Sequence, residues 1–102
     1  SGLVSRNGLV KVFEEDLSPF ELKRFAGMLK EKFPESSIGV FSPIEGGFNY
    51  VIASSDPELP KISKSLNAKL NGRGGGRDGM VQGTYRVDKK AVEEAFDEIF
   101  SK

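Results

Sequence analysis

A glycine-rich run late in the chain constrains its fold more than any other segment. Six of the twelve residues in 72–83 are glycine, and three of them stand in a row between Arg73 and Arg77. Ordering a glycine costs about 0.5–1 kcal/mol more than ordering an alanine, and a purely structural connection could use fewer. The run therefore predicts a functional loop in which several backbone amides and two arginines converge on one anion, most commonly a phosphate.

The amino-acid composition limits the kinds of metal site and catalytic group that the chain can contain. The 102 residues include no cysteine and no histidine, which excludes disulfides, thiolate zinc sites and histidine general bases. Because no acidic metal motif and no long apolar span is present, we expect no metal, no cofactor, no membrane contact and a cytoplasmic location. The acidic run Glu14-Glu15-Asp16 has no basic or metal-binding partner in the sequence. We interpret it as a solvated turn and not as a hydrolase site.

The charges are unevenly distributed along the chain. The formal net charge is zero, yet residues 61–90 carry eight Lys and Arg against two Asp. The segments on either side are both acidic. A positive block centred on the glycine run is the distribution that a polyanion site requires, although a solvated face with scattered lysines would look similar.

Periodicity and capping residues predict seven elements. Strands are expected at 8–14, 37–42, 48–54 and 80–85. Helices are expected at 19–33, from a start within residues 56–60 up to residue 70, and at 89–100. Ser18 and Glu21 fit a capping box around Pro19, and Asp88 suits the N-cap of the last helix. The phenylalanines of the apolar stripes are expected in the core.

The resulting order is β-α-β-β-α-glycine loop-β-α. It predicts an α+β (α/β-like) fold with a small mixed sheet of about four strands and three helices. Residues 1–2 are interpreted as a remnant of recombinant expression, and residues 3–102 as a single glycine-rich accessory domain excised from a larger protein.

The candidate site follows from the glycine run and its neighbours. Phosphate contacts are expected from loop amides, the two arginines, the Gln82 amide and lysines of the preceding helix. The predicted binding residues are Arg73, Gly74, Gly75, Gly76, Arg77, Gln82, Lys61, Lys64 and Lys69. The spacing matches neither a nucleotide-triphosphate loop nor a dinucleotide-binding loop, and no catalytic residue is expected.

The same run carries a family resemblance. Arg73-Gly74-Gly75-Gly76-Arg77 followed by Met80-x-Gln82-Gly83 resembles the signature G-G-R-G-G-G-R-P-D-M-A-Q-G-G. That signature belongs to the glycine-rich C-terminal domain of alanyl-tRNA synthetases and long-form alanyl-tRNA editing proteins. A relative of the domain follows the catalytic domain of DHH phosphoesterases. This chain departs from the signature at Asn71, Asp78, Gly79, Val81 and Thr84.

The resemblance implies a function. In that family the domain contacts the tRNA elbow and links the aminoacylation and editing modules, so the implied partners are tRNA or another nucleic acid and the catalytic or editing domain of the same polypeptide. The editing chemistry of the family uses H-x-x-x-H and C-x-x-x-H sets, which this chain lacks. It is therefore expected to be a non-catalytic, RNA-binding part of an alanyl-tRNA synthetase-related or alanyl-tRNA editing protein.

Two alternatives stay open from the sequence. The chain could be the substrate-binding half of a DHH-type phosphoesterase that acts on nucleotides or single-stranded ends. It could instead be a dimerisation module, with a homodimer as its assembly. Arg77 stands in the region where the phosphoesterase version carries a histidine, which favours the alanyl-tRNA branch.

Overall fold

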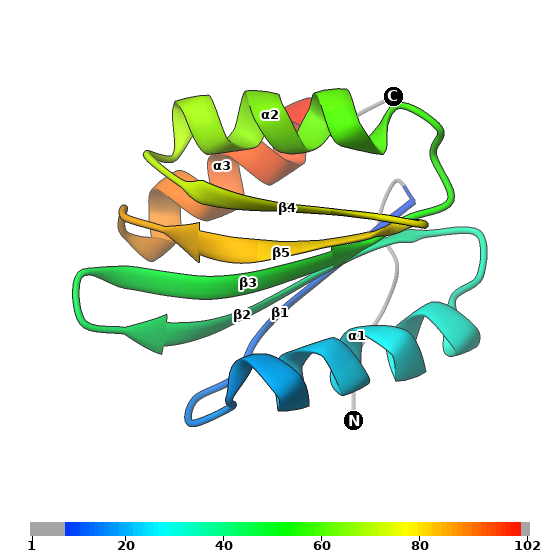
Figure 1. Ribbon diagram of the computed structural model, residues 1–102, viewed down its shortest axis with the longest axis horizontal. Helices are drawn as coiled ribbons and strands as arrows, with labels where there is room; N and C mark the ends of the chain where they lie inside the picture. The colour runs from blue at the N-terminus through cyan, green and yellow to red at the C-terminus, as the bar shows by residue number, and fades with distance from the viewer. Residues whose placement is uncertain (1–7, 101–102) are drawn as a thin grey trace.

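The computed structural model describes residues 8–100, in which three helices pack on one five-stranded sheet (Figure 1). The elements are β1 (Leu9–Phe13), α1 (Pro19–Lys32), β2 (Ser37–Ile44), β3 (Gly47–Ala53), α2 (Leu59–Lys69), β4 (Arg73–Arg77), β5 (Met80–Tyr85) and α3 (Lys89–Ile99). The strand order is β1-β2-β3-β5-β4. Only β1 and β2 are parallel, so the sheet is mixed. Helix α1 lies on one side of the sheet, and α2 and α3 lie on the other.

This architecture confirms the predicted α+β class and the order of the other elements. The strand count was wrong by one, because the glycine run forms β4 and not a loop. The expected remnant at residues 1–2 lies outside the described residues.

Local sequence signals set where the helices begin. The Ser18 hydroxyl accepts from the Glu21 amide at 3.1 Å, and the Glu21 carboxylate accepts from the Ser18 amide at 2.9 Å. This reciprocal pair confirms the capping box. The Asp88 carboxylate caps α3 by accepting from the Ala91 amide at 2.9 Å. After α2, Asn71 takes a φ of 51°, which turns the chain into β4.

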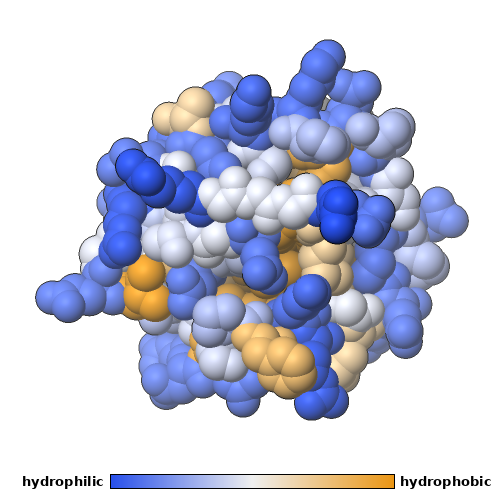
Figure 2. All heavy atoms as spheres, viewed as in Figure 1, coloured by the Kyte–Doolittle hydropathy of each residue, from blue (hydrophilic) through white to orange (hydrophobic). Residues whose placement is uncertain are grey.

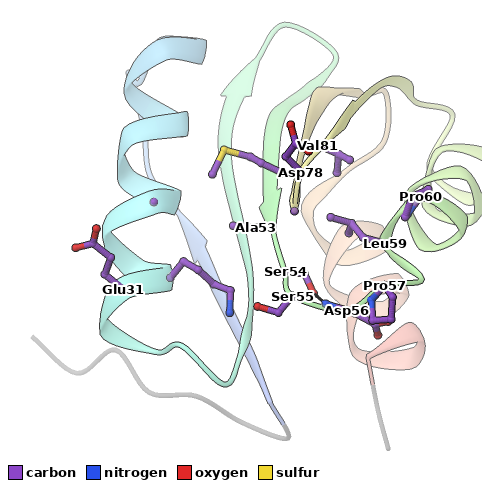
Figure 3. A pocket seen from close by; sticks show the side chains of 14 residues that line it. Glu31, Ala53, Ser54, Ser55, Asp56, Pro57, Leu59, Pro60, Asp78 and Val81 are labelled. Carbon is purple, nitrogen blue, oxygen red and sulfur yellow. Dashed lines mark hydrogen bonds between the residues drawn. The ribbon is translucent and has the colours of Figure 1, made fainter.

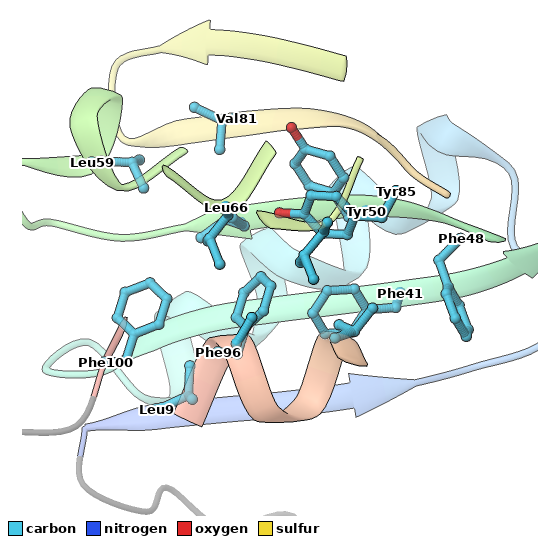
Figure 4. Packing of buried hydrophobic residues seen from close by; sticks show 14 residues of the cluster. Leu9, Phe41, Phe48, Tyr50, Leu59, Leu66, Val81, Tyr85, Phe96 and Phe100 are labelled. Carbon is cyan, nitrogen blue, oxygen red and sulfur yellow. The ribbon is translucent and has the colours of Figure 1, made fainter. Parts of the chain in front are cut away.

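Two hydrophobic clusters fill the two sides of the sheet. Under α1, the buried side chains are largely aliphatic and include Val40, Val51 and Leu22. Under α2 and α3, the cluster is rich in aromatic rings (Figure 4). There Tyr50 and Tyr85 stack with ring centroids 4.0 Å apart. The aromatic cluster therefore lies between strands β2, β3 and β5 on one side and helices α2 and α3 on the other.

Candidate functional site

Strand β4 is an exposed strand that pairs with β5 and forms one edge of the sheet within residues 8–100. All five of its residues are exposed, and a two-residue turn of Asp78 and Gly79 joins the two strands. Both turn residues have positive φ, 61° and 82°, as a type I′ hairpin turn requires. Figure 1 views the molecule from this edge, with α2 above β4 and α1 below it.

Close packing within the hairpin accounts for two of the three central glycines. A Cβ added to Gly74 would lie 2.2 Å from the Gln82 carbonyl oxygen, and Gly74 also has a φ of 155°. A Cβ added to Gly76 would lie 2.3 Å from the Met80 carbonyl oxygen. A Cβ at Gly75, in contrast, meets nothing within 4 Å. The fold therefore requires glycine at positions 74 and 76 but not at 75.

The hairpin geometry determines which backbone amides and carbonyls of β4 do not hydrogen-bond to β5. Arg77 and Met80 flank the two-residue turn, so they form a hydrogen-bonded pair, and the pairing then alternates along the ladder. The amides and carbonyls of Gly74 and Gly76 consequently point away from β5. One of these groups, the Gly74 carbonyl, accepts from the Asn67 side chain of α2 at 3.5 Å.

A groove separates this edge from α2. It has a volume of about 390 Å³ and is lined by Pro60, Lys61, Ser63, Lys64, Asn67, Gly74, Gly75, Gly76 and Val81. The side-chain oxygen of Asn67, one of these residues, accepts from the Tyr50 hydroxyl at 3.2 Å. Burial raises the pKa of Tyr50, so this hydroxyl stays a neutral donor. The groove thus combines two lysines with outward-pointing glycine amides.

The other predicted residues lie on the opposite face of the sheet. Gln82 pairs with Val51, whose side chain packs under α1, so Gln82 faces the α1 side. Arg73 pairs with Thr84 and Arg77 with Met80, which places both arginines on that same side. The predicted set is therefore divided by the β4 edge. The lysines lie on the α2 side, and the arginines and Gln82 lie on the α1 side.

Ion pairing distinguishes the predicted cations. Lys69 lies 2.6 Å from the Glu98 carboxylate, and this contact lowers the pKa of Glu98. Lys61 lies 3.5 Å from Glu58 and is highly exposed. Within residues 8–100, Arg73, Arg77 and Lys64 have no carboxylate within ion-pair distance. Lys69 is thus paired with a carboxylate of α3, whereas the two arginines are available to bind an external anion.

Figure 2 shows a pale band over β4 with strongly hydrophilic residues at its ends.

A larger hollow, which the sequence did not indicate, lies at the turn end of β4 and β5. It has a volume of about 680 Å³, and its walls come from α1, the end of β3, the start of α2 and the Asp78-Gly79 turn (Figure 3). Ser54 lies there, held by the Ser37 hydroxyl at 2.8 Å and by the Gly79 carbonyl, which accepts from its amide. Among the described residues no group of three His, Cys, Asp or Glu could hold a metal ion.

Comparisons with known proteins agree on the family. The family model described as the DHHA1 domain matches residues 5–102. The alanine–tRNA ligase of Malacoplasma penetrans is 35% identical over 71 residues, which are 62% of this chain and 8% of the ligase. That of Acholeplasma laidlawii is 29% identical over 79 residues, which are 76% of this chain and 9% of the ligase. The chain thus spans less than a tenth of the length of these relatives.

A solved structure shares the fold. The C-Ala domain of the Aquifex aeolicus alanyl-tRNA synthetase superposes with a TM-score of 0.72 at 23% sequence identity. The match covers 90% of this chain and 88% of that one. In residues 8–100, no helix combines the length and the apolarity needed to cross a bilayer.

Proposed function

The chain belongs to the DHHA1 domain family, and from this premise we propose that it is a nucleic-acid-binding accessory domain whose ligand is transfer RNA. In this proposal the chain is a non-catalytic, cytoplasmic part of an alanyl-tRNA synthetase-related or editing polypeptide. Its share of the ligase relatives' length supports the role of one module among several. The catalytic or editing domain of the same polypeptide is then its covalent partner.

One observation carries the proposal: an exposed strand of glycines lies between two arginines that have no carboxylate partner among the described residues. A guanidinium binds phosphate oxygens through two parallel hydrogen bonds. The outward amides of Gly74 and Gly76 add donors at the same edge, and an absent side chain at Gly75 lets a ligand approach the backbone. Such contacts position a nucleic acid without reading its sequence.

The lysines have unequal roles in this proposal. Lys61 and Lys64 line the groove beside the glycines and extend the positive surface to the α2 side of the edge. Lys69 contributes least, because Glu98 already neutralises it. Gln82 completes the set on the α1 side through its exposed amide.

The test is a titration of tRNA at several salt concentrations. Arg73→Ala combined with Arg77→Ala is expected to weaken binding and to lower the slope of log K against log salt by about 0.7–0.9 for each lost phosphate contact. Arg24→Ala with Lys32→Ala is the matched control, since it removes two exposed cations of α1, a helix that packs mainly on β2 and β3.

The outcomes separate the alternatives. An unchanged slope in the double arginine variant would rule out this site. Displacement of tRNA by a free nucleotide at modest concentration would favour the substrate-binding half of a phosphoesterase. A homodimer stays a prediction, which sedimentation in the absence of RNA tests independently.

A further inference from the structure

In the part of the chain that the structure describes, no helix covers the β4 edge of the sheet on the α1 side. Helix α1 packs mainly over β2 and β3. Strands β5 and β4 continue the sheet beyond β3, away from β1 and β2. On this side Val51, Ala53 and Met80 pack against α1, whereas the residues nearer the β4 edge are exposed or half-buried. We call this surface the open sheet face, and its residues are Asn49, Arg73, Gly75, Arg77, Gln82 and Thr84.

The open sheet face is polar and offers both kinds of hydrogen-bonding group. The Thr84 hydroxyl donates to the Asn49 side-chain oxygen at 3.2 Å, which leaves the Asn49 amide nitrogen to donate outward. The exposed Gln82 amide provides another donor and another acceptor. Gly75 lies beside Gln82 across the hairpin and leaves the surface flat at that point.

Lysines of α1 border the same surface. Gly27 and Lys30 line the hollow that also contains Met80 of β5, so this side of α1 faces β5. Lys23 stands four residues before Gly27 and lies on the same side of the helix. The open sheet face is thus flanked by Lys23 and by Lys30, whose ammonium also donates to the Pro34 carbonyl oxygen just after α1, in addition to the arginines at the ends of β4.

Aromatic rings are absent from the open sheet face. Both tyrosines are buried, with exposed fractions of 1% and 0%. The strongly exposed aromatic side chain among the described residues, Phe20 at 69%, belongs to the first turn of α1, beside this face, and not to a strand of the face itself. Proteins that grip single-stranded nucleic acid stack its bases on exposed aromatic side chains. A double helix needs no such platform, because its bases are already stacked on one another and its phosphates and, in RNA, its 2′-hydroxyls are held in a regular array that a surface can match.

We propose that the open sheet face binds the backbone of double-helical RNA and discriminates against single strands. This inference rests on the proposed function and assigns the face, the residues and the form of the ligand. Arg73, Arg77, Lys23 and Lys30 bind phosphates on the two sides of a minor groove. Gln82, with Asn49 and Thr84, binds ribose 2′-hydroxyls between them.

The experiment measures binding of the full chain to four probes by fluorescence anisotropy at one salt concentration. The probes are an RNA duplex, a DNA duplex of the same sequence, an unstructured RNA single strand and tRNA. The RNA duplex is expected to bind about tenfold more tightly than the single strand, because the duplex holds its phosphates and 2′-hydroxyls in one fixed arrangement, whereas a single strand must be ordered before it makes the same two or three hydrogen bonds.

Two variants assign the discrimination to this face. Gln82→Ala with Thr84→Ala is expected to remove most of the preference for RNA duplex over DNA duplex and to leave the salt slope unchanged. Lys23→Ala with Lys30→Ala is expected to lower the salt slope by about 0.9 for each lost duplex contact. Ser65→Ala on α2 serves as the neutral control, and far-UV circular dichroism checks that each variant is folded.

The results distinguish two failures. If the single strand binds as tightly as the duplex, or if the lysine variant keeps the full slope, this inference is overturned while the proposed function stands. If none of the four probes binds, the proposed function fails and this inference fails with it.

Discussion

Strands β2 and β4 belong to one sheet but are held in it by different forces. The five residues from Ile38 to Ser42 of β2 are all buried, between α1 on one side and the aromatic cluster on the other. Strand β4 buries no side chain and is held by backbone pairing with β5 and by the close fit of its glycines. Strand β2 is held in place by its buried side chains, whereas the side chains of β4 are exposed and available to contact a ligand.

The largest expected difference between the two strands is in stability. Phe41→Ala should lower the free energy of unfolding by about 3–5 kcal/mol, because it empties a fully buried site that contacts Phe13 and Phe96. Arg73→Ala should change it by less than about 0.5 kcal/mol. Urea denaturation of both variants checks this, and a large loss in the arginine variant would show that β4 is held partly by its side chains.

A smaller effect separates two neighbouring glycines within β4. Gly76→Ala should destabilise the fold by about 1–3 kcal/mol, since its methyl group would collide with the Met80 carbonyl. Gly75→Ala should leave stability within about 0.5 kcal/mol of the original. Thermal unfolding of the two variants compares them directly. Equal losses of stability in the two variants would contradict the conclusion that close packing requires glycine at position 76 but not at 75. If Gly75→Ala keeps its stability, a tRNA titration of that variant reports on the ligand contact alone.

The smallest expected effect concerns the tyrosine pair beneath β4. Among the described residues the Tyr85 hydroxyl is buried without a hydrogen-bond partner, whereas the Tyr50 hydroxyl donates to Asn67. Tyr85→Phe should therefore keep or raise stability by about 1 kcal/mol, and Tyr50→Phe should lower it by a similar amount. Denaturation midpoints at neutral pH check the pair, and a substantial loss in Tyr85→Phe would mean that its hydroxyl is satisfied in solution.

The same pair predicts an alkaline limit to stability. Burial raises the pKa of Tyr85 above the value of 10.0 for an unperturbed tyrosine, so the folded state disfavours the charged phenolate. Stability is then constant below about pH 10, where the unfolded chain begins to titrate, and falls as the pH rises further. Tyr85→Phe should flatten this decline, which unfolding measurements across the alkaline range detect.

The sequence predicted the parts of the fold in which side chains determine the structure. Ser18 with Glu21, the stripe that includes Leu22 and Leu29, and the apolar residues of β2 all gave signals that the structure confirms. It missed β4, because the run Arg73–Arg77 has neither an alternating pattern nor β-branched residues. Its pairing depends on the Asp78-Gly79 turn and on glycines that permit a close approach, and both read as loop signals.

The candidate site could be predicted as a set of residues but not as an arrangement. The sequence indicated both arginines and three lysines, yet it gave no sign that β4 would separate them onto two sides of an edge. Nor could it show that Lys69 is paired with Glu98, since these residues come together only when α2 packs against α3. Spacing along a chain specifies which groups are available, whereas strand register specifies which of them act together.

The position of the two arginines also bears on self-association. If two copies of the chain joined their β4 edges in antiparallel fashion around Gly75, Arg73 of each copy would stand directly opposite Arg77 of the other. Like charges in directly opposed positions destabilise a strand pair, and here the repulsion would occur twice. The charges at the ends of β4 therefore protect an unpaired edge from sheet-to-sheet aggregation, and the strand can stay open without a covering segment.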